Sequence, residues 1–287
     1  MKRSEQQEMM DLPGQPRELL EGNFADIRMI NRYMGNYRSV IRGLSWLVQE
    51  QQLVDFSLLD IGTGSGDIPA RISYWAQRRG LRARIVGLEA EPTTARLAAM
   101  QTRQENPPLI PRTCEQMCDP PLTSPPSRGR EERGLLPRFL STVIPAEAGI
   151  QWEKEEDLPR HGISVVRGNG CEPPFGPASF DFVLASQLLH HFSEDQIVSL
   201  LKTWSKVARK AIIVSDLVRH PAAYYGIRII TKLFTRNVMT QTDAPLSVRR
   251  AFTAAEWRDI FRRADVGPLR LFSVFPFRML ALISVRG

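Results

Sequence analysis

The sequence predicts an α/β fold in which a seven-stranded, mostly parallel sheet carries helices on both faces. Short apolar runs alternate along the chain with segments of helical periodicity, as in strand–helix–strand units. The last two apolar runs follow each other without an intervening helix, so we expect an antiparallel last strand. With 287 residues, of which 43% are apolar, the chain is long enough to bury the core that such a sheet needs.

The N-terminal part is expected to be helical. Apolar residues recur at helical spacing from Phe24 to Gln52, and Gly35-Asn36 interrupts them, so two helices are predicted there. We expect residues 1–52 to form a helical cap on a main domain of residues 53–287. Residues 1–22 are expected to be frayed or loosely helical.

The main domain is expected to begin with a strand and to continue as strand–helix pairs. The predicted strands are Phe56–Ile61, Arg82–Glu89, Gly162–Arg167, Ser179–Ser186, Ala211–Ser215, Leu269–Phe275 and Phe277–Val285. Helices are predicted at Ile68–Arg79 and from Pro92 to Gln104, since proline suits a first helical turn. Two further helices are expected to start at capping boxes, in which a hydroxyl and a side chain three residues later satisfy free helix-end donors; the sequences are Ser193-Glu-Asp-Gln196 and Thr253-Ala-Ala-Glu256.

Residues 107–160 interrupt this alternation of predicted strands and helices. They hold ten of the 21 prolines, show no periodicity, and include the low-complexity stretch PPLTSPPSRGREERG. Irregular loops of this length are uncommon inside compact domains. We therefore interpret the segment as a disordered insertion; a lid over the active site is the alternative.

Charge and cysteine content set limits on partners and location. The net charge of +7 permits contact with nucleic acid or an anionic membrane but requires neither. No apolar run approaches the roughly 18–20 residues of a membrane span. Three cysteines and the absence of an export signal favour a cytoplasmic protein. Cys114 and Cys118 have no second pair to complete a zinc site, so no metal is expected.

The stretch LLDIGTGSGDIP, residues 58–69, predicts a ligand-binding loop after the first strand. Gly62, Gly64 and Gly66 allow a sharp turn and a close approach of the backbone to a ligand. Loops at this end of a parallel sheet are where such folds bind ligands. A dinucleotide-binding loop needs a small residue at Asp67, because a carboxylate there would repel the pyrophosphate.

This loop resembles the first motif of class I S-adenosylmethionine-dependent methyltransferases. The resemblance implies a Rossmann-like fold and S-adenosylmethionine as cofactor, whose cationic groups suit carboxylates at Asp60 and Asp67. Glu89, at the end of the second strand, would accept hydrogen bonds from the ribose hydroxyls. The segment VVRGNGCEPPFGPASFDFVLASQLLHHF, residues 165–192, is similar to later motifs of the family. It would place near the cofactor the residues Asn169, Gly170 and Ser186.

LLHHF, residues 188–192, is common at this point in small-molecule methyltransferases of the bacterial type, including relatives of quinone-biosynthesis C-methyltransferases. The resemblance implies that His191 or His190 could deprotonate a hydroxyl acceptor. The alternative is that one histidine packs under the sheet and the other lies at the surface. The aromatic, amphipathic segment 222–236 suggests an apolar acceptor and is compatible with peripheral membrane contact.

The sequence therefore predicts an enzyme that methylates a small, apolar or aromatic molecule at oxygen or carbon. Nucleic acid is not an expected partner, because Ser186-Gln187-Leu188-Leu189 stands where amino-methylating enzymes need an N/D-P-P-Y/F motif. The alternatives are an RNA or protein methyltransferase, or a non-catalytic partner protein with a cofactor fold. The acceptor and the oligomeric state stay open.

Overall fold

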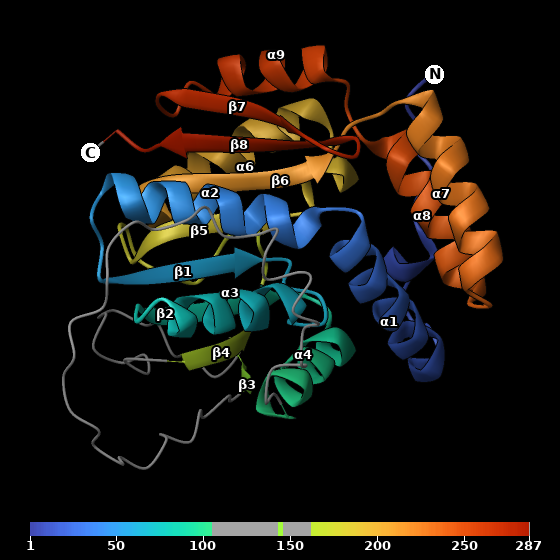
Figure 1. Ribbon diagram of the computed structural model, residues 1–287, viewed down its shortest axis with the longest axis horizontal. Helices are drawn as coiled ribbons and strands as arrows, with labels where there is room; N and C mark the ends of the chain where they lie inside the picture. Colours follow the sequence, from blue (N-terminus) through green and yellow to red (C-terminus); the bar gives the residue numbers. More distant parts are fainter. Residues whose placement is uncertain (105–142, 146–161, 287) are drawn as a thin grey trace.

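A computed structural model describes residues 1–104, 143–145 and 162–286, which form one sheet between layers of helices (Figure 1). The described strands follow the order β3-β4-β2-β1-β5-β6-β8-β7. Their bounds are β1 Asp55–Ile61, β2 Arg82–Glu89, β3 Val143–Pro145, β4 Gly162–Arg167, β5 Phe180–Ser186, β6 Ala208–Leu217, β7 Leu269–Val274 and β8 Arg278–Ser284.

The predicted α/β fold with an antiparallel last strand is confirmed. All pairings among strands β1 to β6 are parallel, and β8 runs antiparallel to both of its neighbours, β6 and β7. All seven predicted strands are present, and β3 adds an eighth by pairing with β4 at Val143 and Val165. Strand β3 lies within the expected insertion; the rest of that expectation, residues 107–142 and 146–160, lies outside the described residues.

The helices predicted to start at Ile68, Pro92 and the two capping boxes begin within one residue of those positions, whereas the first helix begins at Arg17, before the predicted Phe24. They are α1 Arg17–Tyr33, α2 Asn36–Glu50, α3 Asp67–Arg78, α4 Pro92–Gln104, α6 Glu194–Val207, α7 Pro221–Phe234, α8 Val238–Arg250 and α9 Ala254–Ala264, with short 3-10 turns η1 Met9–Asp11 and η4 Leu189–His191. Both capping boxes form, from Ser193 with Gln196 and from Thr253 with Glu256. None of the helices in the described part of the chain is long and apolar enough to cross a membrane.

The core lies on both faces of the sheet, because alternate side chains of a strand point in opposite directions. On one face Leu58 packs in a cluster with residues of α2 and α3. On the other face Leu59 packs with α6 and α9, which contribute the buried indoles of Trp204 and Trp257. Helix α2 therefore covers the sheet, whereas α1, α7 and α8 lie beyond the carboxyl ends of the parallel strands (Figure 1).

The first residues are held against α8, so the expectation that residues 1–22 are frayed or loosely helical is wrong for residues 4–10. Ser4 donates its backbone N–H to the carbonyl of Arg249 at 3.0 Å. The N–H groups of Met9 and Met10 donate to the carboxylate of Asp243 at 2.8 and 3.0 Å. These contacts join residues that are far apart in the chain, so no local sequence pattern predicts them. They carry the Glu8 side chain into the interior.

Candidate functional site

A cavity of about 220 Å³ opens at the carboxyl ends of β1, β5 and β6. The glycine loop and the end of β5 form one wall, and α1, α7 and α8 supply the others. Seven of the predicted site residues line this cavity: Asp60, Gly62, Gly64, Asp67, Ser186, His190 and His191. The structure thus brings the predicted cofactor loop and the predicted catalytic histidines to one space.

The three glycines of the loop have different surroundings, although each has a positive φ. A Cβ at Gly62 would lie 2.8 Å from the side chain of Leu188, and one at Gly66 would lie 3.2 Å from the carbonyl of Ala98 in α4. A Cβ at Gly64 would have only Phe24 nearby, at 3.6 Å. Gly64 is therefore the glycine that faces open space, while Gly66 serves the packing of the loop on α4.

Asp60 is a buried carboxyl at the base of the loop. It is 1% exposed and accepts a hydrogen bond from the Thr63 hydroxyl at 2.8 Å. Burial raises the pKa of Asp60 to about 8, the Thr63 hydrogen bond opposes the rise, and the nearby charges of Asp67 and Glu89 add to it. Among the described residues no basic side chain forms an ion pair with Asp60. A cationic ligand group in the cavity would supply the missing positive charge.

Asp67 also lines the cavity, but its oxygens already have partners. Oδ2 accepts hydrogen bonds from Asn31 of α1 at 3.0 Å and from the Tyr37 hydroxyl of α2 at 2.9 Å. Oδ1 accepts one from Ser65 at 3.2 Å. Burial and the charge of Asp67 raise the pKa of Tyr37. Asp67 therefore ties the glycine loop to the α1–α2 pair, a role that the sequence did not suggest.

Glu89, Asn169 and Gly170 lie outside the cavity lining, although Glu89 contacts the glycine loop at Gly64. Glu89 accepts hydrogen bonds from three backbone N–H groups, those of Gly64 at 3.0 Å, Ala90 at 3.0 Å and Glu91 at 3.2 Å.

The other two residues of this group follow β4. Asn169 is exposed, and its Oδ1 accepts the N–H of Cys171 at 2.9 Å. The carbonyl of Gly170 accepts the indole N–H of Trp204 at 2.8 Å. A Cβ at Gly170 would lie 2.6 Å from Ile61, so close packing requires glycine there.

A polar network lies beside Ser186, at the end of β5. The Ser186 hydroxyl accepts a hydrogen bond from Asn36 at 3.0 Å. Arg278 is 2% exposed and donates to the carbonyl of Met34 at 2.9 Å, to Gln187 at 3.1 Å and to Asn36 at 3.3 Å. Burial lowers the pKa of Arg278 to about 10, which leaves it charged at neutral pH.

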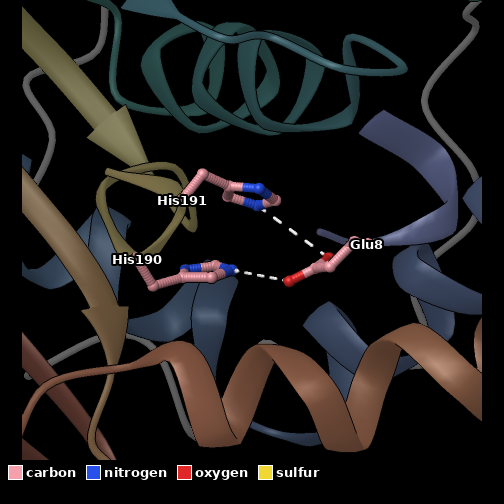
Figure 2. Close-up of side chains that lie close together, drawn as sticks. All are labelled: Glu8, His190 and His191. Atoms are coloured by element: carbon pink, nitrogen blue, oxygen red, sulfur yellow. Dashed lines mark ion pairs between the residues drawn. The ribbon is translucent and has the colours of Figure 1, made fainter. Parts of the chain in front are cut away.

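His190 and His191 lie side by side in η4, directly after β5. The Nδ1 of His190 is 2.7 Å from Asp216 in β6, and the Nδ1 of His191 is 2.8 Å from Asp11 in η1. The two Nε2 atoms face the carboxylate of Glu8 (Figure 2), at 3.7 Å from His190 and 3.9 Å from His191. Each imidazole is thus held between two carboxylates.

The carboxylates around the histidines differ in their pKa. Burial raises the pKa of Glu8 to about 7, opposed by His191 and by the hydrogen bond from Ser247. Burial also acts to raise the pKa of Asp216, but the charge and hydrogen bond of His190 outweigh it and hold that pKa below its ordinary value. The same balance, with His191 as partner, lowers the pKa of Asp11. Asp216 and Asp11 are therefore the carboxylates that orient the rings.

Four residues of the site were not predicted: Glu8, Asp11, Asp216 and Arg278. Asp216 had a usable signal, because it follows the apolar run AIIVS and so falls at the carboxyl end of a parallel strand. Glu8 and Asp11 reach the site through the path of the N-terminal segment over α8. Arg278 reaches it through the antiparallel pairing of β8 with β6.

The comparisons with known proteins agree with this architecture. A family model described as "Methyltransferase domain" matches residues 143–213. A search of curated proteins found no match. Human N-acetylserotonin methyltransferase, solved in complex with S-adenosylmethionine, superposes with a TM-score of 0.52 at 15% identity, over 94% of this chain and 56% of that chain. A proposed O-methyltransferase from Nostoc punctiforme superposes with a TM-score of 0.50 at 16% identity, over 99% of this chain and 64% of that chain.

The solved structures confirm the predicted Rossmann-like fold, and the family model matches a methyltransferase domain over residues 143–213. The chain spans 56% and 64% of the lengths of the two solved proteins. At such identities the likeness describes the fold, and the chemistry must be argued from the site of this chain.

Proposed function

We propose that this protein is an S-adenosylmethionine-dependent methyltransferase that acts on a small, apolar or aromatic molecule. The observation that carries the proposal is the shared cavity. One side of it presents Asp60, a buried carboxyl without a cationic partner among the described residues, beside the open face of Gly64. The other side presents two imidazoles, each oriented by a carboxylate.

The residues of the loop suit the methionine end of the cofactor. S-adenosylmethionine, when bound, supplies an electrophilic methyl group on a positively charged sulfur. Asp60 would balance positive charge, and Gly64 leaves the backbone open to close approach. Glu89 would accept a hydrogen bond from one ribose hydroxyl, because a carboxylate has about four lone-pair positions and its present partners leave one of them free. Asn169 and Gly170 would border the adenine.

The acceptor side of the cavity is apolar. Its lining includes Ile27 and Ile30 of α1, Met34 directly after α1, and Ile227 and Ile230 of α7. A volume of about 220 Å³ is below the roughly 300–1,000 Å³ of pockets that enclose a whole drug-sized ligand. The cavity therefore suits the reacting end of a small acceptor, with the helices beyond the sheet enclosing it.

The histidine pair provides the base for an acceptor hydroxyl. Because Nδ1 of each ring donates to a carboxylate, the Nε2 lone pair is available to take a proton. The side chain of His191 is 17% exposed and that of His190 3%, so His191 is the more accessible base. Removing the hydroxyl proton serves O-methylation directly and also activates a phenol-like ring for C-methylation.

Calorimetry with S-adenosylmethionine tests the cofactor half of the proposal. Gly64→Arg should abolish binding, because the side chain would fill the space in front of the loop. Gly80→Arg is the matched control, since Gly80 also has a positive φ and has no neighbour within 4 Å of a Cβ. Absence of binding by the unaltered protein, or binding unchanged in Gly64→Arg, would reject the proposal in favour of a non-catalytic partner protein.

Mass spectrometry with isotopically labelled cofactor and host extract tests the acceptor half. The expected product is a small molecule that carries the label. Label recovered in RNA or protein, together with salt-dependent retention of RNA, would instead support the alternative macromolecular methyltransferase.

A second proposal concerns location: the outer face of α7 rests on an anionic membrane surface at the cytoplasmic side. Tyr225, Ile229 and Leu233 recur at helical spacing and are 61%, 58% and 72% exposed. Three basic residues flank this apolar stripe: Arg228, Lys232 and Arg236. The exposed free thiol of Cys171 is compatible with a reducing compartment.

Flotation with vesicles of anionic phospholipid tests the membrane contact. The unaltered protein should float with the vesicles, and Ile229→Glu with Leu233→Glu should stay in the dense fraction. Val54→Glu is the control, because Val54 is similarly exposed, at 66%, but lies before β1. Equal flotation of both variants would contradict the assignment to α7.

A further inference from the structure

We propose that Glu8, His190 and His191 form a binding site for a divalent transition-metal ion of the zinc type. One ligand atom of each residue lies within 4.8 Å of the others (Figure 2). Two imidazoles and a carboxylate are a ligand set used by zinc in catalytic sites. The three residues come from the first residues of the chain and from η4, so only the folded protein brings them together.

The distances suit an ion placed between the three side chains. Glu8 Oε1 is 3.7 Å from Nε2 of His190, and Glu8 Oε2 is 3.9 Å from Nε2 of His191. A tetrahedral zinc ion with bonds of about 2.0–2.2 Å separates its ligand atoms by roughly 3.3–3.6 Å. These two distances involve different oxygens of Glu8, and a set with one ligand atom from each residue lies within 4.8 Å. Side-chain rotations that bring the ligand atoms closer by up to about 1 Å would therefore give bonding geometry.

The groups behind the ligands orient them toward this point. Asp216 and Asp11 accept from Nδ1 of His190 and His191, at 2.7 and 2.8 Å. A carboxylate on the far nitrogen fixes the tautomer with a lone pair on Nε2, as is usual for histidines that bind metal. The Ser247 hydroxyl donates to Glu8 at 2.8 Å and fixes that carboxylate.

The lone pairs of Glu8, His190 and His191 can point toward the space between these three side chains. When both rings are neutral and their Nδ1 atoms donate to carboxylates, the two Nε2 atoms and the Glu8 carboxylate present lone pairs to one another. Such an arrangement needs a cation or shared protons at its centre, because Glu8 and His190 are each 2% exposed and bulk water does not separate the groups.

The surrounding charges also favour a dication. Four carboxylates lie in or around the cluster, those of Glu8, Asp11, Asp216 and Asp243. Two guanidinium groups lie beside it: Arg250, whose Nε is 3.9 Å from Glu8, and Arg3, which donates to the carbonyl of His190 at 3.2 Å. With neutral imidazoles the formal charge is −2, which a divalent ion would balance.

The site would have an open coordination position. Glu8, His190 and His191 all line the cavity, so a fourth ligand can reach the ion from there. Three protein ligands with one open position are typical of catalytic rather than structural zinc. Resting on the proposed methyltransferase function, we infer that the acceptor oxygen takes this position. The ion would lower the pKa of the hydroxyl, whose proton would pass to water in the cavity, and both imidazoles would then serve as ligands instead of as bases.

Calorimetric titration of the chelator-treated full chain with Zn²⁺ tests the site. We expect one ion per chain. We also expect a loss of at least about 100-fold in affinity in Glu8→Gln and in His191→Gln. Glu5→Gln and His220→Gln are the controls, because they remove the same groups elsewhere and should leave Zn²⁺ affinity unchanged. Asp11→Asn, which alters only an orienting group, should weaken binding by about 10–100-fold.

Binding of S-adenosylmethionine is measured on the same samples and shows whether each variant is folded. Absence of Zn²⁺ binding by a protein that binds the cofactor would overturn the metal site and leave the proposed function standing. Zn²⁺ affinity unchanged in both Glu8→Gln and His191→Gln would overturn it as well. Zn²⁺ binding without cofactor binding would support the site and reject the methyltransferase proposal.

Discussion

Asp216 Oδ1 lies 2.7 Å from Nδ1 of His190, and both residues are almost fully buried. Asp216 also accepts the backbone N–H groups of His190 and Leu217, at 3.2 and 2.7 Å. The carboxylate therefore fixes the position of the histidine backbone as well as the tautomer of its ring. The pair joins the ends of two neighbouring parallel strands, β5 and β6.

Asp216→Asn should therefore impair methyl transfer more than cofactor binding. An amide can donate to Nδ1, which would favour the tautomer with its proton on Nε2 and remove the available lone pair. We expect kcat to fall by about 100-fold or more, because His190 and His191 face the same carboxylate of Glu8 and provide general-base catalysis as a pair. The dissociation constant for S-adenosylmethionine should change little.

Asp195→Asn is the control for this prediction, because Asp195 is an exposed carboxylate at the start of α6. The dependence of kcat on pH gives the further readout, since loss of the oriented ring should remove the ionisation assigned to the base. A kcat unaffected by Asp216→Asn would contradict the role of His190.

The break between α1 and α2 depends on a single glycine. Gly35 has a φ of 81°, and a Cβ there would lie 2.7 Å from the carbonyl of Phe275. Gly35→Ala should lower the free energy of unfolding by at least about 1–2 kcal/mol, the cost of a left-handed conformation for a residue with a Cβ. Urea denaturation measures the loss.

Gly80→Ala separates the two causes of that loss. Gly80 has a φ of 67° and no neighbour within 4 Å of a Cβ, so this variant should carry the conformational cost alone. Gly35→Ala should be the less stable of the two because of the clash with Phe275. Equal stabilities would mean that the α1–α2 junction moves to admit the methyl group.

Arg278 supports the site from the start of β8. Its guanidinium joins Met34, Asn36 and Gln187 by three hydrogen bonds. Arg278→Lys keeps the charge, but one ammonium group does not have the planar fork that reaches all three acceptors. We expect a loss of about 1–3 kcal/mol in the free energy of unfolding, as for buried acceptors left unpaired.

Arg286→Lys provides the comparison, because Arg286 pairs with Asp265 at the surface, where both side chains are more than half exposed. Its effect should be near zero, since exposed ion pairs contribute little. A similarly small effect for Arg278→Lys would show that the network adapts to the shorter donor.

Local signals predicted the fold well. The strands, the two capping boxes and the break at Gly35 each depend on a few adjacent residues, and the structure has them at or near the expected positions. The topology followed as well, because strand–helix alternation leaves few arrangements for a parallel sheet. The glycine loop and the histidine pair could be placed at one edge of the sheet for the same reason.

Long-range packing decided the rest of the site. Nothing near Glu8 in the sequence indicates that it faces two histidines, because that contact depends on α8 holding the first residues of the chain. The hydrogen bonds of Asp67 to Asn31 and Tyr37 likewise depend on how α1 and α2 meet the loop. A carboxylate in a ligand-binding motif can thus hold neighbouring helices in place by hydrogen bonds instead of contacting the ligand.

The pKa of Asp60 leads to a prediction about protons in cofactor binding. Because burial raises that pKa to about 8, Asp60 is protonated in most free molecules at pH 7. A cationic ligand group favours the carboxylate and lowers the pKa, so binding should release most of one proton. Affinity for S-adenosylmethionine should therefore rise as the pH increases from about 6 to 8 and then level off.

Calorimetry at pH 7 in two buffers with different ionisation enthalpies measures this proton release. Asp60→Asn should bind more weakly and show no release from this group, whereas Asp55→Asn, an exposed acid at the start of the same strand, should behave as the unaltered protein.

In the absence of the ligand, Asp60 should make the folding stability fall as the pH increases, which is opposite to its effect on cofactor affinity. The raised pKa means that the folded state holds the proton more firmly, so the contribution of Asp60 to stability is lost as the pH rises from about 4 through 8. Saturating cofactor should remove this loss, because the carboxylate then has a positive partner. If the difference in the free energy of unfolding between the cofactor-bound and the free protein does not depend on pH, the assignment of Asp60 to the cationic end of the ligand is contradicted.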